Sequence, residues 1–252
     1  MLRTVPLAVL ATVLLGTGCT DPNLDTRLAA IEAKIDNLDK KMDGIKAAPQ
    51  GAPGAAAAKP GAASPEDEQK ASELLQAANK AMGEMKFDDA KAKLAELKSK
   101  FGTTRAARAA SRLEGELAVV GKPAGELTVE KWHQGQVAGF DDGKATLLVF
   151  WEVWCPHCKR EVPKIGETYS KYNSKGLNVV GLTKQSRDKS DDDVKAFIKD
   201  TNVTYPIAKE DGKLSTHFGV RGVPAAAVVK DGEVVWRGHP ARLTDDMIEK
   251  WL

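Results

Sequence analysis

The 252-residue chain has little of several kinds of residue, and each shortage excludes a class of protein. Its 37 Lys and Arg residues stand against 35 Asp and Glu, and a net charge of +2 excludes a nucleic-acid binder built on bulk positive charge. Three cysteines are too few for a disulfide-stapled scaffold and cannot supply two four-cysteine metal sites. No Phe, Trp or Tyr precedes Phe87, and 12 of the 14 lie from Trp132 onward. We therefore expect the main hydrophobic core in the second half of the chain.

Residues 1–18 have the pattern of an export signal. A short positive start ending at Arg3 precedes an apolar run over residues 5–15, which is too short to cross a hydrocarbon core that needs about 20 residues. The following Gly16-Thr-Gly-Cys19 resembles the bacterial lipoprotein signal, although Gly16 stands where that family usually has Leu. The resemblance implies lipidation of Cys19 and a lipoprotein anchored to a membrane of the bacterial cell envelope, facing the periplasm. Ordinary signal cleavage, with Cys19 a bystander, is the alternative.

Residues 19–46 contain a heptad pattern that predicts a coiled coil. The apolar side chains recur at alternating spacings of four and three: Leu24, Leu28, Ile31, Ile35, Leu38, Met42 and Ile45. In a parallel homo-oligomer Arg27 would face Glu32 and Lys34 would face Asp39, whereas like charges would meet in an antiparallel pair. Ile at two of the four d positions weakly shifts the preference from a dimer towards a trimer or tetramer, and we expect a trimer or dimer. A single amphipathic helix lying on another surface is the alternative.

A linker and a small helical module are expected next. Residues 47–64 are mostly Ala, Pro and Gly, which is typical of a linker. Residues 65–120 predict three helices, with Ser64 capping the first, a break at residues 83–86 and a third helix over residues 104–120. The small and large apolar positions resemble one tetratricopeptide (TPR) repeat, although stacked repeats generally need at least three units. The module is interpreted as a spacer or support, with a peptide-docking surface as the alternative.

The second half of the chain carries a Cys-x-x-Cys motif between a predicted strand and a predicted helix. Residues 145–151 (ATLLVFW) predict a buried strand that leads into Trp154-Cys-Pro-His-Cys158, and residues 159–172 predict the helix. An exposed Cys155 at a helix N-terminus would gain a stabilised thiolate, and Cys158 would lie within reach to close a disulfide.

Other uses of the two cysteines fit less well. A zinc site needs four ligands, and the chain has no second cysteine pair. A c-type haem site would need His directly after Cys158, where Lys159 stands. We therefore expect redox chemistry without a metal or other cofactor, with a structural disulfide as the alternative.

The predicted elements that follow have an α/β order. They are a buried strand over residues 177–182, a helix over 191–201, two strands over 225–229 and 233–237, and a final helix capped by Thr244. A βαβ unit followed by a β-hairpin and a helix predicts a sheet covered by helices.

Three motifs together resemble the thioredoxin fold: FW-x-x-WCPHC, GVRGVP and KDGEVVWRG. Their spacing is similar to that of the membrane-anchored TlpA/ResA-like branch, and the resemblance covers residues 121–252. It implies a central mixed sheet flanked by helices, preceded here by the coiled-coil stalk and the TPR-like module. It also implies that Pro224 is a cis-proline opposite the cysteines and that Val223 offers backbone hydrogen bonds to an incoming chain. Trp154, Val223 and Pro224 are thus the expected substrate contacts.

The chain departs from the family pattern beside the cysteines. Pro156-His157 resembles the oxidising DsbA proteins, and a neighbouring histidine would stabilise the Cys155 thiolate and make the pair more oxidising. The buried acid that thioredoxins often carry six residues before the first cysteine is Val149 here. Glu152 either takes over proton transfer for Cys158 or is a solvated rim residue. For His239, outside these motifs, we expect a surface or packing role.

The expected activity is thiol–disulfide exchange on protein substrates. A membrane redox partner is expected to exchange electrons with the Cys155–Cys158 pair. Cys155 attacks or is attacked through a mixed disulfide, and Cys158 resolves it. A reductant for cytochrome c maturation or similar thiol delivery, a DsbA-like oxidase and an oligomeric DsbC-like isomerase are the enzyme alternatives. A lipoprotein scaffold with incidental redox activity is the alternative of a different class.

Overall fold

A computed structural model describes residues 30, 33–34, 63–140 and 142–252. The predictions of a signal peptide, of Cys19 lipidation and of the linker up to residue 62 lie outside these residues, as does the coiled coil except for residues 30, 33 and 34. The residues from 63 onward belong to one compact unit, which holds a three-helix module and a sheet domain.

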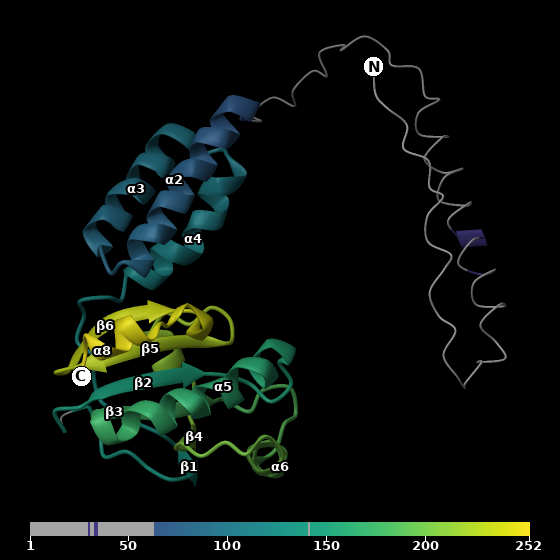
Figure 1. The fold of residues 1–252 in the computed structure, drawn as a ribbon, viewed down its shortest axis with the longest axis vertical. Coiled ribbons are helices and arrows are strands. Elements are labelled where there is room, and N and C mark those ends of the chain that lie inside the picture. The colour runs from purple at the N-terminus through teal and green to yellow at the C-terminus, as the bar shows by residue number, and fades with distance from the viewer. Residues whose placement is uncertain (1–29, 31–32, 35–62, 141) are drawn as a thin grey trace, which may run out of the picture. The chain divides into compact units, whose positions relative to one another are not determined.

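Six strands of the described residues form one mixed sheet in the order β1-β4-β3-β2-β5-β6 (Figure 1). Their bounds are β1 Lys131–Gln134, β2 Ala145–Phe150, β3 Leu177–Thr183, β4 Ile207–Lys209, β5 Ala225–Lys230 and β6 Glu233–Gly238. β2 and β3 are parallel, as are β3 and β4, whereas β5 is antiparallel to both β2 and β6. The central strands β2 and β3 are buried along their whole length, which agrees with their continuous apolar sequence. The predicted mixed sheet is confirmed; β1 and β4, which are short, were not among the predicted strands.

Helices cover both faces of the sheet (Figure 1). α5 (Pro156–Tyr172), α6 (Asp191–Thr201) and α8 (Asp245–Glu249) share one hydrophobic cluster with alternate residues of the strands. The short α7 (Lys213–His217) and residues of the 119–140 segment form the cluster on the opposite face. Two short 3₁₀ helices, η1 (Asn173–Lys175) and η2 (Pro240–Arg242), follow α5 and β6. Thr244 caps α8, as predicted.

The module before the sheet consists of α2 (Pro65–Gly83), α3 (Phe87–Phe101) and α4 (Arg105–Leu117). Ser64 and Thr104 cap α2 and α4, since each side chain accepts a backbone N–H of the first turn. The three helices have a core of their own, which includes Ala78, Leu94, Leu97 and Leu113. The predicted helices are therefore present, while the likeness to a TPR unit stays a prediction.

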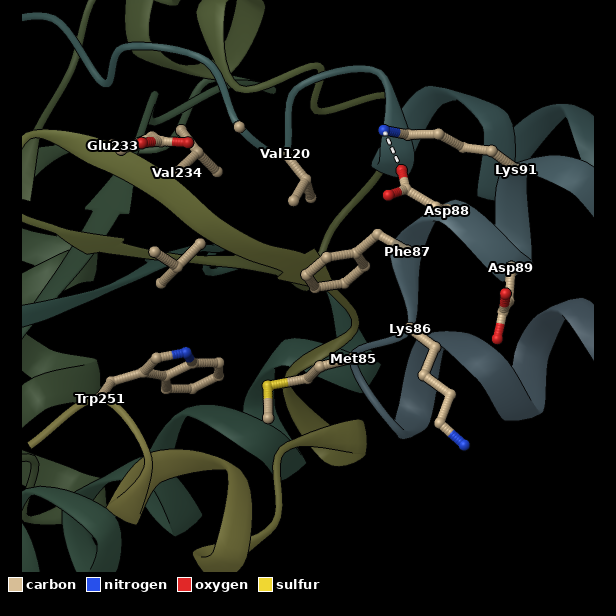
Figure 2. A pocket seen from close by; sticks show the side chains of 12 residues that line it. Met85, Lys86, Phe87, Asp88, Asp89, Lys91, Val120, Glu233, Val234 and Trp251 are labelled. Atoms are coloured by element: carbon tan, nitrogen blue, oxygen red, sulfur yellow. Dashed lines mark hydrogen bonds and ion pairs between the residues drawn. The ribbon is translucent and has the colours of Figure 1, made fainter.

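The turn between α2 and α3 packs against the sheet domain. Met85 and Phe87 contact the larger core cluster from this turn. In Figure 2 Met85 points towards Trp251, and Val120 lies beside the Phe87 ring. All four residues line a hollow of about 640 Å³. Apolar contact at this end means that the module and the sheet domain share part of their core.

None of the helices built from the described residues combines the length and the apolar character needed to cross a membrane.

Candidate active site

Cys155 is the N-cap residue of α5 and lies just beyond the end of β2. Its Sγ accepts the backbone N–H of Cys158 at 3.4 Å, so the sulfur occupies the position of a capping oxygen. Pro156 is the first helical residue, where its missing N–H costs nothing, and the helix therefore begins three residues before the predicted start at Lys159. The prediction that Cys155 is exposed was wrong: 4% of the residue is accessible.

A loop from far along the chain covers Cys155. The thiol donates to the backbone carbonyl of Val223 at 3.5 Å, and the Val223–Pro224 peptide bond is cis, as the family resemblance implied. Val223 is half-buried and Pro224 is buried at the start of β5. The pairing of β5 with β2 brings this loop to the cysteines, because Phe150 and Ala225 are partners in the ladder.

Cys158 is fully buried, and burial raises the pKa of its thiol well above the usual range. The neighbouring Cys155 and the negative charge of Glu152 act in the same direction, while a hydrogen bond from the backbone of Glu152 opposes them. Both cysteines are free thiols here. An attack by Cys158 on a disulfide therefore needs a group that takes its proton.

Glu152 is the acidic group beside Cys158. The residue is 3% exposed, so its interpretation as a solvated rim residue was wrong. Its Oε2 accepts the backbone N–H of Ser186 at 3.1 Å and the hydroxyl of Thr183 at 3.4 Å, whereas Oε1 has no partner among the described residues. Val149, at the position where thioredoxins often carry the acid, is buried in β2. A buried carboxylate with one oxygen unused can accept a proton.

The loop that follows β3 holds both Glu152 and Trp154, and sequence reasoning missed it. Ser186 Oγ accepts the indole N–H of Trp154 at 2.9 Å, and the Arg187 guanidinium lies 3.6 Å from the centre of the Trp154 ring. Gln185 and Arg187 both have positive φ, an uncommon conformation for residues other than glycine. The parallel order of β2 and β3 could have predicted this loop's position. The carboxyl ends of parallel strands lie at one edge of the sheet, so the residues after β3 lie beside those after β2.

His157 is exposed on the first turn of α5. Its Nδ1 lies 2.6 Å from Nη2 of Arg160, and because a guanidinium only donates, the ring nitrogen is the acceptor. Lys159 and Arg160, both exposed, add positive charge directly after the cysteines, and the sequence motif singled out neither residue.

A cleft of about 470 Å³ opens beside the cis-proline. The residues that line it come from four places in the chain. They include His157 on α5, Val223 and Pro224 with Arg221 in the loop before β5, Arg112 and Glu116 on α4, and Arg237 and His239 at the end of β6. Trp154 and Glu152 lie outside this lining. The helical module was interpreted as a spacer or support, with a peptide-docking surface as the alternative, and its contribution to this cleft was not predicted.

His239 is half-buried in this cleft and caps η2 through its Nδ1, which accepts the backbone N–H of Ala241 at 3.2 Å. Burial lowers the pKa of His239, and the positive charges of Arg112 and Arg242 add to this effect. These contacts give His239 a packing and capping role.

Residues 63–140 and 142–252 contain no cluster of three or more His, Cys, Asp or Glu side chains that could hold a metal ion.

The strand order, the Cys-x-x-Cys at the start of α5 and the cis-proline opposite it define a thioredoxin-fold domain with a dithiol site. Residues 120–237 match the model of the AhpC/TSA family.

The curated relatives are thiol–disulfide oxidoreductases and a thioredoxin-like protein. The thiol-disulfide oxidoreductase ResA of Bacillus thuringiensis subsp. konkukian is 32% identical over 112 residues, which are 44% of this chain and 62% of ResA. The thioredoxin-like protein YneN of Bacillus subtilis is 29% identical over 48% of this chain and 72% of its own length. The chain thus spans less than two thirds of the length of this ResA.

Two solved structures are similar to about half of this chain. StoA from Bacillus subtilis is 25% identical with a TM-score of 0.42, over 49% of this chain and 94% of StoA. A thioredoxin-like protein solved in the oxidised form is 29% identical with a TM-score of 0.46, over 52% of this chain and 94% of its own.

Proposed function

We propose that this protein is an exported, membrane-anchored thiol–disulfide oxidoreductase that exchanges disulfides with protein substrates through Cys155 and Cys158. The observation that carries the proposal is the position of Cys155 Sγ, between the N–H of Cys158 at 3.4 Å and the carbonyl of Val223 at 3.5 Å. The first contact stabilises a thiolate at the start of α5. The second contact places the backbone of Val223 beside the sulfur, where an extended substrate can form hydrogen bonds with it.

In the reducing direction the Cys155 thiolate attacks one sulfur of a substrate disulfide. A bond forms between Cys155 Sγ and that sulfur while the substrate S–S bond breaks, and the leaving sulfur departs as a thiolate that takes up a proton. Cys158 then loses its proton to Glu152 and attacks Cys155 Sγ, which releases the second substrate thiol. The substrate gains two electrons and two protons, and the protein is left with a 155–158 disulfide. The oxidising direction is the reverse of these steps.

Two single substitutions test this order of events. Cys158→Ser should trap substrates on Cys155 as mixed disulfides, because the resolving thiol is absent, and Cys155→Ser should trap none. Non-reducing electrophoresis and mass spectrometry of the variants, expressed in their own cell envelope, measure the trapped species. Equal trapping by both variants, or by neither, would contradict the proposal.

The physiological direction is the second part of the proposal. We favour a reductant of the ResA type, while the Pro156-His157 dipeptide and the Arg160 charge on the same turn support an oxidase, because positive charge stabilises the reduced thiolate form. Equilibration of the 155–158 pair with glutathione buffers measures its reduction potential. A value near about −270 mV would exclude the oxidase, and one near about −120 mV would exclude the reductant.

The anchor and the stalk complete the proposal. Lipidated Cys19 would hold the chain on the membrane, and the heptads of residues 24–45 would assemble a parallel trimer or dimer. A DsbC-like disulfide isomerase places several active sites around one substrate. Oligomerisation through the stalk would therefore support the isomerase alternative. In a scaffold with incidental redox activity, Cys155→Ser would keep the phenotype of the wild-type gene, whereas an oxidoreductase would lose it.

A further inference from the structure

The loop that carries the cis-proline packs directly on α4 of the helical module. Gly219, with φ of +61°, turns the chain beside Gly115 of α4, since a Cβ added at Gly219 would lie 3.4 Å from the Gly115 carbonyl oxygen. A Cβ added at Gly115 would in turn lie 3.6 Å from Cζ of Arg221. Gly115 is thus the place on α4 where the arginine of the cis-proline loop lies across the helix. The module is part of the wall of the cleft.

The charges on this wall are mainly positive. Arg221 is exposed and forms no hydrogen bond or ion pair with any other described residue. Arg112 uses its Nε atom to bind Glu116 at 3.2 Å, and two thirds of its side chain is exposed.

The single carboxylate of the lining is already neutralised. Glu116 is nearly buried and binds Arg242 as well as Arg112. Arg237, the third arginine of the lining, donates to the backbone carbonyls of Phe218, Ala226 and Gly238 and is buried. Arg112 and Arg221 therefore remain as the cations of the cleft that can bind an incoming group.

We infer that Arg112 of α4 and Arg221 of the cis-proline loop make the cleft selective for protein segments with acidic residues beside the reacting cysteine. The inference rests on the proposed function, since the cleft starts at Val223, His157 and Pro224, next to Cys155. Guanidinium groups bind carboxylates through paired hydrogen bonds, so Asp or Glu of an extended substrate is the chemistry that fits. A cleft lined by one sign of charge also raises the rate of encounter with a substrate of opposite charge.

The test uses three peptides that differ only in the residues flanking one cysteine: acidic, neutral or basic. Each cysteine is activated as a mixed disulfide with 2-thiopyridine, whose release is followed by absorbance. The reduced full chain without its signal reacts with each peptide under single-turnover conditions, and glutathione serves as the reference thiol. The variants are Arg221→Gln and Arg221→Glu, chosen because Arg221 forms no hydrogen bond or ion pair with another described residue. Arg105→Gln is the matched control, since Arg105 is an exposed arginine on the first turn of the same helix.

We expect the acidic peptide to react about tenfold faster than the basic one at low ionic strength, in keeping with electrostatic steering. The ratio should shrink in high salt, fall in Arg221→Gln, invert in Arg221→Glu and stay unchanged in Arg105→Gln. Each rate is divided by the rate of the neutral peptide with the same protein, so that any change in the reactivity of Cys155 itself cancels. The absolute rate of the neutral peptide should be the same in Arg105→Gln as in the wild type.

Two results would overturn the inference and leave the proposed function standing. One is equal rates for the three peptides, with the neutral peptide still reacting faster than it does with glutathione. The other is an acidic preference that Arg221→Glu does not change. A neutral peptide that reacts no faster than with glutathione would overturn the proposed function, and the inference with it.

Discussion

The carboxylate of Glu152 accepts the backbone N–H of Ser186 at 3.1 Å, across the parallel edge where β2 and β3 end. Ser186 also accepts the indole N–H of Trp154, so one loop residue fixes both the acid and the tryptophan that precede Cys155. The acid stands three residues before the first cysteine instead of six, and the loop after β3 holds it in place. The positions of Glu152, the proposed proton acceptor, and of Trp154 therefore depend on the same short segment.

Replacing Glu152 by Gln should slow the resolving step by about ten- to a hundredfold, because the amide cannot take the proton of Cys158. Burial keeps the pKa of Cys158 high in the variant too, so its rate should rise steeply with pH, whereas the wild-type rate should depend on pH less strongly. Stopped-flow oxidation of the reduced pair by a peptide disulfide, measured across pH, gives both quantities.

Glu167→Gln is the matched control for this experiment, because Glu167 is an exposed glutamate on α5. It removes the same charge and should leave the pH profile unchanged. Alkylation of Cys155 reports whether the first cysteine is intact in both variants. If Glu152→Gln and Glu167→Gln gave the same profile as the wild type, Glu152 would have no part in the proton transfer.

The elements around the cysteines could be predicted from the sequence because their signals are local. The apolar run before Trp154 is enough for β2, and the GVP motif gives the cis-proline through the family resemblance. Pro156 marks the start of α5, a local signal that the predicted start at Lys159 did not use. The burial of Cys155 depends on contact with Val223, 68 residues away along the chain, and no local pattern contains it.

The same reason explains the residues that were missed. Arg112 and Arg221 line one cleft only because α4 packs on the loop before β5. Ser186 reaches Glu152 only through the pairing of β2 with β3. A short strand such as β4, with three residues, has too few positions to show a period of two. Tertiary contacts of this kind determine the site, while local patterns determine the elements that carry it.

Arg237 should be a main contributor to the stability of the region around the cis-proline. Its guanidinium donates to the carbonyls of Phe218 at 2.9 Å, Ala226 at 3.2 Å and Gly238 at 2.9 Å, and the residue is 3% exposed. Arg237→Met would leave these buried carbonyls without donors, and the free energy of unfolding should fall by about 3 kcal/mol.

Urea unfolding followed by tryptophan fluorescence measures this change. Arg237→Lys should fall between the wild type and Arg237→Met, because an ammonium group cannot reach all of the carbonyls in the geometry of the guanidinium. The exposed Arg105→Met serves as the control and should stay close to the wild type. A stability of Arg237→Met equal to that of the control would contradict the role assigned to the three hydrogen bonds.

Asp191 should make part of the stability depend on acid pH. Hydrogen bonds from Lys131 and from Gln185, the latter at 2.7 Å, hold the pKa of Asp191 at about 2. The pKa of an Asp side chain in the unfolded chain is about 3.9. Between about pH 2 and pH 4 the unfolded state therefore binds more protons than the folded state, and the free energy of unfolding rises with pH. The contribution is present above about pH 4 and is lost as the pH falls towards about 2.

Asp191→Asn should therefore show a smaller loss of unfolding free energy between about pH 4 and pH 2 than the wild type. A series of urea unfolding curves over this range measures the slope, with the exposed Asp192→Asn as the control for the change in net charge. An identical slope in wild type and Asp191→Asn would mean that these hydrogen bonds do not survive in solution.

The heptads of residues 24–45 predict that the mature chain self-associates, and Ile35 lies at the centre of their apolar stripe. Ile35→Asp would place a carboxylate at an a position of every helix, where like charges would meet in a buried seam. Light scattering of the chain produced without residues 1–19 should therefore give two or three chains per particle for the wild type and one for Ile35→Asp. Ala33→Asp is the matched control, since Ala33 occupies the outward f position of the preceding heptad and is helical and exposed. It should keep the wild-type mass, and a monomeric wild type would refute self-association through these heptads.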